Sequence, residues 1–436
     1  MKNFSYFPIY LDKNSELIDP KSIRNNDYSY IGLTHLLLNG FIPPPFTLYE
    51  KIQTIAPMDS FDGSYEYTDL FPKSEVGCYG FDEGVFENKV KEYLDRNVPF
   101  SAKVSILFSG GKDSTTLALL FRRLRPDVRV KLFFLNNLDE INRAKALSIR
   151  LEYELEVVDV NWDDVIGAYA SMQYFCGDLS APNYIVAQKN AEKWSSLIFD
   201  GSGNDLYSGH IPSRNDTIKY HLRKLVGEMP VWMYRVTPPR FRFLFRPRSL
   251  IFTYNYFPVA SEVVGLKPDL VGQYKKYWKN VDDTFKVKPI EDFKVNTRGR
   301  FLDNFQIYTK TFCYSGSSQI LMPFCDATIA SYLAKLYTNE KYEGSRNKEY
   351  LRRYLNSHLN YELIPGGKQG MESIFQKDVT GIYALLRKYR EGSEFITLNY
   401  KTAEKYPGWA QLICGMCIWM DKRGLSIDEF FIEGKV

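Results

Sequence analysis

Between residues 104 and 199, short apolar runs alternate with stretches of helical periodicity, and this alternation constrains the fold more than any other feature of the sequence. We expect buried strands at 104–108, 130–135, 155–160 and 197–199, with helices ahead of Pro126 and over 141–151 and 184–194. A β-α-β-α order of this kind implies a parallel sheet with helices on both faces. The sequence therefore predicts an α/β fold with a doubly wound parallel sheet, whose ligands lie beyond the carboxyl ends of the strands.

The rest of the chain divides around this segment. Residues 1–90 are rich in aromatic residues and proline and form a predicted N-terminal extension or connector. Residues 91–215 are the predicted nucleotide-binding α/β core, and 216–436 a helix-rich substrate lobe. A length of 436 residues suits two or three domains. With 44% apolar and 25% charged residues, the composition excludes a disordered or collagenous chain.

Charge and hydropathy exclude several kinds of partner. The chain has 56 basic and 52 acidic residues, and a net charge of +4 makes a nucleic-acid partner unlikely. No apolar run reaches the roughly 18 residues that span a bilayer, so we expect no membrane partner. The first residues lack the apolar core of an export signal, which favours a cytoplasmic location. Six cysteines are too few for a disulfide framework in so long a chain.

The loop after the first strand of the core has a sequence suited to binding phosphate. Its residues are Ser109, Gly110, Gly111, Lys112, Asp113, Ser114 and Thr115. Two glycines permit close backbone approach to a ligand, and the N-terminus of the following helix attracts anions. Because Asp113 alone would repel phosphate, its presence suggests a bridging Mg²⁺ ion. A Walker A loop is excluded, since that motif requires glycine at position 106 and a hydroxyl residue at 113.

A second polar loop follows the fourth strand. It begins Asp200-Gly201-Ser202-Gly203-Asn204-Asp205, and a dinucleotide fingerprint is excluded because position 206 is leucine. Both loops follow strands of one parallel sheet, so we expect them to meet at the same edge. Asp113 and Asp205 would then clamp Mg²⁺ on ATP from two strands.

The first loop resembles the SGGxDS signature of the PP-loop ATP pyrophosphatases, a superfamily with the adenine nucleotide alpha hydrolase-like fold. The ordered set of motifs is similar to the synthetase domain of asparagine synthetase, which is related to β-lactam synthetase and lasso-peptide cyclases. The segments concerned are 30–64, 139–146, 180–210, Leu321–Asp326 and Arg346–Gly370. The resemblance implies ATP and Mg²⁺ as cofactors, reaction at the α-phosphate, and release of AMP and pyrophosphate.

The resemblance also implies roles for particular residues. Asp113 and Asp205 would bind Mg²⁺ and take part in catalysis, and Lys368 would stabilise charge on the α-phosphate or the departing pyrophosphate. The remaining positions would bind ATP or pyrophosphate: Ser109, Gly110, Gly111, Lys112, Ser114, Thr115, Gly201 and Gly203.

Two departures from the family change the expected chemistry. Complete members begin with a nucleophilic cysteine that heads a glutaminase domain, whereas this chain has Lys2 and no cysteine before Cys78. We therefore expect the amine to be free ammonia, ammonia from a partner protein, or an amine on the substrate itself. In addition, the carboxylate of the family's second loop falls on Ser202, which makes asparagine an unexpected product. Three carboxylates could replace it as the base, namely Glu140, Asp178 and Asp200, and the sequence does not rank them.

The resulting hypothesis is an ATP-dependent, AMP-forming carbon–nitrogen ligase. It would adenylate a small-molecule or peptide carboxylate and transfer the acyl group to an amine, forming an amide or lactam. One alternative is adenylation of a carbonyl or nucleobase followed by sulfur transfer through Cys414 and Cys417, although a lone CxxC in an apolar stretch favours buried structural cysteines. Another alternative is a non-catalytic nucleotide-binding subunit.

Overall fold

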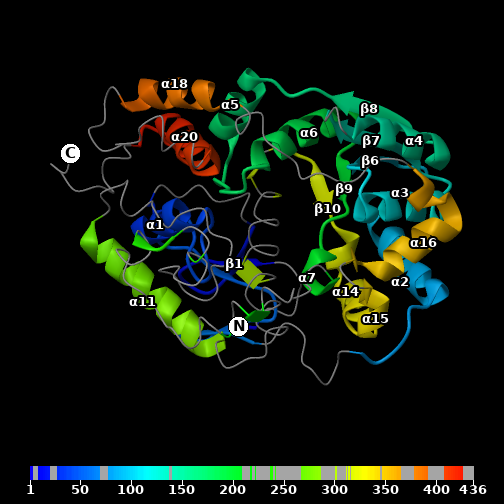
Figure 1. Ribbon diagram of the computed structural model, residues 1–436, viewed down its shortest axis with the longest axis horizontal. Coiled ribbons are helices and arrows are strands. Elements are labelled where there is room, and N and C mark those ends of the chain that lie inside the picture. The colour runs from blue at the N-terminus through cyan, green and yellow to red at the C-terminus, as the bar shows by residue number, and fades with distance from the viewer. Residues whose placement is uncertain are drawn as a thin grey trace.

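A computed structural model shows the arrangement of the chain (Figure 1). It describes residues 1–2, 8–19, 27–68, 77–136, 140–208, 267–285, 316–343, 346–364, 378–390 and 407–425, together with isolated residues between 217 and 314. The statements below concern these residues.

The centre of the molecule is a parallel sheet of five strands. These are β6 (Lys103–Leu107), β7 (Arg129–Leu135), β8 (Glu154–Val158), β9 (Leu197–Asp200) and β10 (Gln319–Leu321). Their spatial order is β10-β9-β6-β7-β8, and every neighbouring pair is parallel. The predicted α/β fold with a doubly wound parallel sheet is therefore confirmed. The sequence did not reveal β10, which joins the edge of the sheet from far along the chain.

Helices cover both faces of this sheet because its strands are apolar on both sides. Along β7, Leu132 and Phe134 face one hydrophobic core and Phe133 faces the other. The first core is completed by α2 (Glu83–Asn97), α3 (Lys112–Leu124), α4 (Ile141–Leu151) and α16 (Glu349–Leu359). The second is completed by α5 (Trp162–Ser171), α6 (Ala181–Trp194), α18 (Val379–Arg390) and α20 (Pro407–Asp421).

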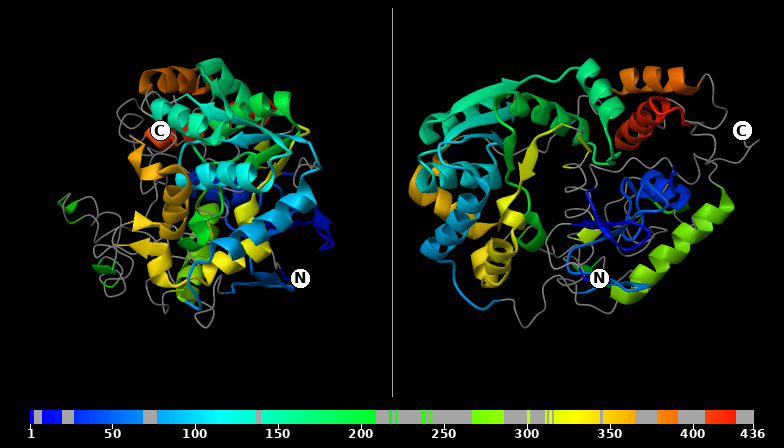
Figure 2. Two further views of the ribbon diagram at one scale, coloured as in Figure 1. Left: turned by 90° about the vertical axis from the view of Figure 1, so that its right-hand side faces the viewer. Right: turned by 180° about the vertical axis from the view of Figure 1, so that it is seen from behind.

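The N-terminal segment forms two small antiparallel sheets and one helix, and it shares the second hydrophobic core with α5, α6 and α20 (Figure 2). Strands β1 (Ile9–Leu11), β2 (Leu17–Ile18) and β3 (Gln53–Ile55) form an antiparallel sheet, and β4 (Ser60–Phe61) pairs with β5 (Tyr65–Glu66). Helix α1 (Tyr30–Asn39) lies beside α11 (Pro268–Phe285). The sequence showed little helical periodicity here because eight of the ten α1 residues are buried, so no polar stripe marks an outer face.

Short elements complete the described fold. They are α7 (Asp205–Ser208), η5 (Pro323–Cys325), α14 (Ala327–Ala334), α15 (Thr338–Lys341), β11 (Tyr342–Glu343), β12 (Arg346–Asn347) and η6 (Tyr361–Leu363). Among the described helices, none combines the length and the apolar character needed to cross a membrane. The divisions after residues 90 and 215 stay predictions.

Candidate active site

The loop between β6 and α3 is held by hydrogen bonds from its backbone to its own serine hydroxyls. The backbone N–H of Ser109 donates to Ser114 Oγ at 3.1 Å, and the N–H of Gly111 donates to Ser109 Oγ at 3.3 Å. Gly110 adopts φ +67°, a left-handed conformation that favours glycine. Helix α3 begins at Lys112 and has no side-chain cap, so its N-terminus can attract an anion.

The loop after β9 lies directly against the start of α3. A Cβ atom at Gly201 would lie 2.8 Å from the carbonyl carbon of Asp113 and from the backbone nitrogen of Ser114. At Gly203, where φ is +126°, a Cβ atom would lie 2.7 Å from Cys325 Sγ. Both glycines are thus required by close packing around the site. Their contact with a nucleotide stays a prediction.

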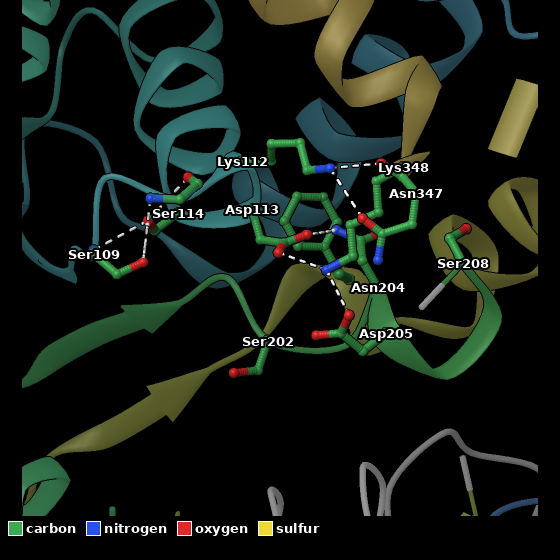
Figure 3. A network of polar contacts seen from close by, with 12 residues as sticks. Ser109, Lys112, Asp113, Ser114, Ser202, Asn204, Asp205, Ser208, Asn347 and Lys348 are labelled. Atoms are coloured by element: carbon green, nitrogen blue, oxygen red, sulfur yellow. Dashed lines mark hydrogen bonds and ion pairs between the residues drawn. The ribbon is translucent and has the colours of Figure 1, made fainter. Parts of the chain in front are cut away.

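The two loops bring Asp113 and Asp205 to a single cation (Figure 3). Lys348 Nζ lies 2.6 Å from Asp113 Oδ2 and 2.9 Å from Asp205 Oδ1. The lysine side chain is 4% exposed, whereas that of Asp205 is 43% exposed. The two carboxylates that the sequence placed around one magnesium ion therefore converge in the structure, with an ammonium group between them.

Burial alone would lower the pKa of Lys348, but the charges of Asp113 and Asp205 outweigh it and hold this pKa well above its ordinary value. The residue has φ +56° and ψ +47°, a left-handed conformation that is unfavourable for a side chain of this size. It joins β12 to α16, so elements on both sides hold it in place. Sequence reasoning missed this lysine, whose one signal was its position within the Arg346–Gly370 motif.

The side-chain amide of Asn204 binds Asp113 from the other side, and two phenols in turn bind Asn204. Asn204 Nδ2 donates to Asp113 Oδ1 at 2.9 Å. The side-chain oxygen of Asn204, Oδ1, accepts hydrogen bonds from Tyr207 Oη at 2.8 Å and from Tyr350 Oη at 3.1 Å. Because Tyr350 lies on α16, this network ties the C-terminal half of the chain to the second loop. It also fixes the orientation of the Asp113 carboxylate.

Lys112 supplies a second ammonium group near the cluster. Its Nζ donates to the backbone carbonyl of Asn347 at 2.5 Å and to Asn347 Oδ1 at 3.0 Å. Burial and the nearby charge of Lys348 lower its pKa. Two cationic side chains thus lie beside the candidate phosphate loop.

Other predicted residues have different environments. Thr115 is fully buried, and its hydroxyl has no hydrogen-bond partner among the described residues. Ser202 points away from the Asp113–Lys348–Asp205 cluster (Figure 3). Lys368 lies outside the described residues. Cys414 and Cys417 are buried in α20, where burial raises the pKa of the Cys414 thiol, as is typical of structural cysteines.

Comparison with known families agrees with this geometry. Residues 85–242, which include both loops, match the family model of asparagine synthase. This part of the chain is similar to the asparagine synthase family, as the motifs of the two loops predict. This match supports an enzyme that uses ATP. No curated protein matched the chain.

Solved structures show a weak similarity to about half of this chain. The NH3-dependent NAD synthetase of Campylobacter jejuni is 16% identical over 48% of this chain and 98% of its own, with a TM-score of 0.23. The NMN synthetase of Francisella tularensis is 15% identical over 50% and 94%, with a TM-score of 0.25. The U34-tRNA thiolase of Methanococcus maripaludis is 15% identical over 49% and 76%, with a TM-score of 0.24. Values this low support no argument about function.

The donor set formed by Asp113 and Asp205 fits a hard divalent cation. Carboxylate oxygens are the ligands that Mg²⁺ prefers, and two of them already approach one positive charge here. The second carboxylate, Asp205, is 43% exposed, so a cation held there could also be reached by further ligands such as phosphate oxygens.

Proposed function

We propose that the chain is an ATP-dependent, AMP-forming ligase. It would adenylate a carboxylate substrate with release of pyrophosphate, and then transfer the acyl group to ammonia or to an amine on the substrate. The convergence of Asp113 and Asp205 on one cation is the observation that carries the proposal. The family match over residues 85–242 supports it.

In this proposal the β6–α3 loop binds the pyrophosphate portion of ATP. Ser109, Ser114 and the N-terminus of α3 would supply hydrogen-bond donors, with Gly110 and Gly111 giving access to the backbone. The ammonium groups of Lys112 and Lys348 would neutralise phosphate charge. Catalysis would come from positioning and from charge stabilisation, since the side chains form no covalent intermediate.

Asp113 and Asp205 would hold Mg²⁺, which would supply charge neutralisation to the triphosphate when bound. Lys348 would then release one or both carboxylates and turn its ammonium group toward phosphate. Lys368, which lies in the segment that resembles the family's LR…P…K-x-G motif, is proposed to stabilise charge on the α-phosphate or the departing pyrophosphate. We also propose that the amine is free ammonia, ammonia supplied by a partner protein, or an amine on the substrate.

The alternative of sulfur transfer is less well supported. It requires a thiolate, and burial in α20 disfavours ionisation of Cys414. No described feature favours it over amide formation.

The test is pyrophosphate release from ATP across a panel of carboxylic acids, with and without ammonium. We expect an acid-dependent release of pyrophosphate and AMP, and a loss of about 100-fold or more in Asp113→Asn, by analogy with the removal of other charge-stabilising groups. Asp163→Asn, at an exposed position on α5, is the matched control and should retain full activity. Release of ADP, or tight ATP binding without turnover for any acid, would overturn the proposal; the latter result would favour a non-catalytic subunit.

A further inference from the structure

The second half of the proposed reaction needs a proton acceptor. An amine that attacks an acyl adenylate becomes positively charged and must lose a proton. At the position where the family carries a glutamate, this chain has Ser202, whose side chain points away from the cluster (Figure 3). The inference below rests on the proposed function, and concerns which carboxylate takes this proton.

Asp200 lies at the junction of the two loops. It is the last residue of β9 and is paired in register with Leu107, the last residue of β6. It therefore lies at the carboxyl edge of the sheet, beside the strand that leads into the phosphate loop. The next residue, Gly201, packs directly on the backbone of Asp113.

The side chain of Asp200 is held in one orientation. It is 7% exposed, and its Oδ1 accepts a hydrogen bond from the backbone N–H of Ser202 at 2.6 Å. The carboxylate thus lies next to the position of the missing glutamate.

One polar residue of α6 lies next to this carboxylate. Tyr184, which is 2% exposed, interacts with Asp200, and burial together with the Asp200 charge raises the pKa of its phenol. The phenol therefore keeps its proton and can donate to the carboxylate. The adjacent Asn183 and, one turn on, Gln188 have buried amide atoms without hydrogen-bond partners among the described residues.

The two other candidates have different surroundings. Asp178 Oδ1 accepts from the backbone N–H of Ser180 at 2.8 Å and from its hydroxyl at 2.7 Å, which closes the turn before α6. Glu140 precedes α4, a helix that packs in the core on the face of the sheet opposite to α6.

We propose that Asp200 is the base for the amine and that Tyr184 is a positioning residue for its carboxylate. The amine nitrogen forms a bond to the acyl carbon, and the bond from that carbon to the AMP oxygen breaks, so AMP leaves with the electron pair. The proton lost by nitrogen passes to an oxygen of Asp200 and later to water. The first half of the reaction, adenylation, does not use this carboxylate.

The test separates the two halves with Asp200→Asn, in which the amide oxygen can still accept from Ser202. Adenylation is followed as ATP–pyrophosphate exchange with the acid found in the panel above, and amide formation with ammonium as the amine. We expect exchange to persist and amide formation to fall about 100-fold or more, the usual contribution of a general base. Hydroxylamine, whose adduct loses its proton more readily, should recover part of the rate, and Asp200→Glu should recover more activity than Asp200→Asn.

Asp163→Asn, at an exposed position on α5, is the control, and it should leave both halves of the reaction unchanged. Tyr184→Phe should lower amide formation less than Asp200→Asn does. Exchange and amide formation that are both normal in Asp200→Asn would overturn the role of Asp200 alone, and equal loss of both would show a structural role. If the unaltered chain shows no exchange with any acid, the proposed function itself fails, and the role of Asp200 fails with it.

Discussion

At the scale of single residues, Lys348 shows how a buried charge is stabilised in this protein. An ammonium group that is 4% exposed loses most of its hydration, and the loss is offset by two carboxylates within 3 Å. The same carboxylates would repel each other without a cation between them. The ammonium group of Lys348 therefore offsets the repulsion between the two carboxylates.

Replacing Lys348 by methionine tests this arrangement without measuring catalysis. We expect a loss of stability somewhat below the roughly 3–5 kcal/mol typical of a broken buried pair, because Asp205 is 43% exposed. Millimolar MgCl₂ should raise the thermal unfolding temperature of Lys348→Met more than that of the unaltered chain, since the two carboxylates are then open to the metal. Lys193→Met, at an exposed position of α6, is the control. An equal response to MgCl₂ in all three proteins would contradict the prediction.

His35 shows the opposite case, a titratable group that is buried without a charged partner. Its ring is stacked on Phe46 and contacts Tyr274, and its Nδ1 lies 3.3 Å from Asn39 Nδ2. Burial lowers the pKa of His35 from 6.5 to about 3. Below pH 6.5 the unfolded chain therefore binds a proton that the folded protein excludes, and stability falls as the pH falls toward 3.

The predicted consequence is a loss of about 2 kcal/mol between pH 7 and pH 5 from this residue alone. Denaturant unfolding at the two pH values measures it. His35→Gln should lack this part of the pH dependence, even though it is less stable at both values. A variant that keeps the whole dependence would show that other groups cause it.

At the scale of elements, prediction from sequence succeeded where burial is one-sided or the strand is flanked by turns. The strands around 104–108, 130–135, 155–160 and 197–199 and the helix over 141–151 follow from local periodicity, and the structure confirms them as β6, β7, β8, β9 and α4. Helix α1 was missed because it is buried on nearly all sides. Strand β10 was missed because three residues carry no periodic signal, and its pairing with β9 depends on contacts across more than a hundred residues.

The same distinction applies to the site. Residues of the β6–α3 loop and the convergence of Asp113 with Asp205 could be predicted, since carboxyl ends of parallel strands share an edge. Lys348 could not, because its place depends on the packing of α16 against α3 and on the left-handed turn that precedes α16.

At the scale of the whole molecule, a buried ion pair joins distant parts of the chain. Asp59 and Arg300 form an ion pair in which both side chains are fully buried. Burial raises the pKa of Asp59, and the Arg300 charge partly offsets this. Tyr65 Oη and the backbone N–H of Thr68 also donate to the Asp59 carboxylate, at 2.8 Å each. This cluster anchors the segment between β3 and residue 68 to residue 300.

Removing one partner should cost more than removing both. Asp59→Asn leaves a buried guanidinium without its counter-ion, for which we expect a loss of about 3–5 kcal/mol in unfolding free energy. The double variant Asp59→Asn with Arg300→Met should be more stable than Asp59→Asn, since it buries no unpaired charge. Chemical denaturation of the two single variants and the double variant gives the coupling energy. Additive losses would contradict a direct interaction.

The sequence by itself determined the parallel α/β core, the glycine-rich loop between β6 and α3, and the two carboxylates at the edge of the sheet. These features depend on local periodicity and on a geometric property that all parallel sheets share. Only the tertiary structure decided that Lys348 lies between those carboxylates, that Asp200 lies beside the position of the missing glutamate, and that β10 completes the sheet. Such contacts join residues far apart in the chain, and their stability comes from burial and charge pairing that exist only once the chain has folded.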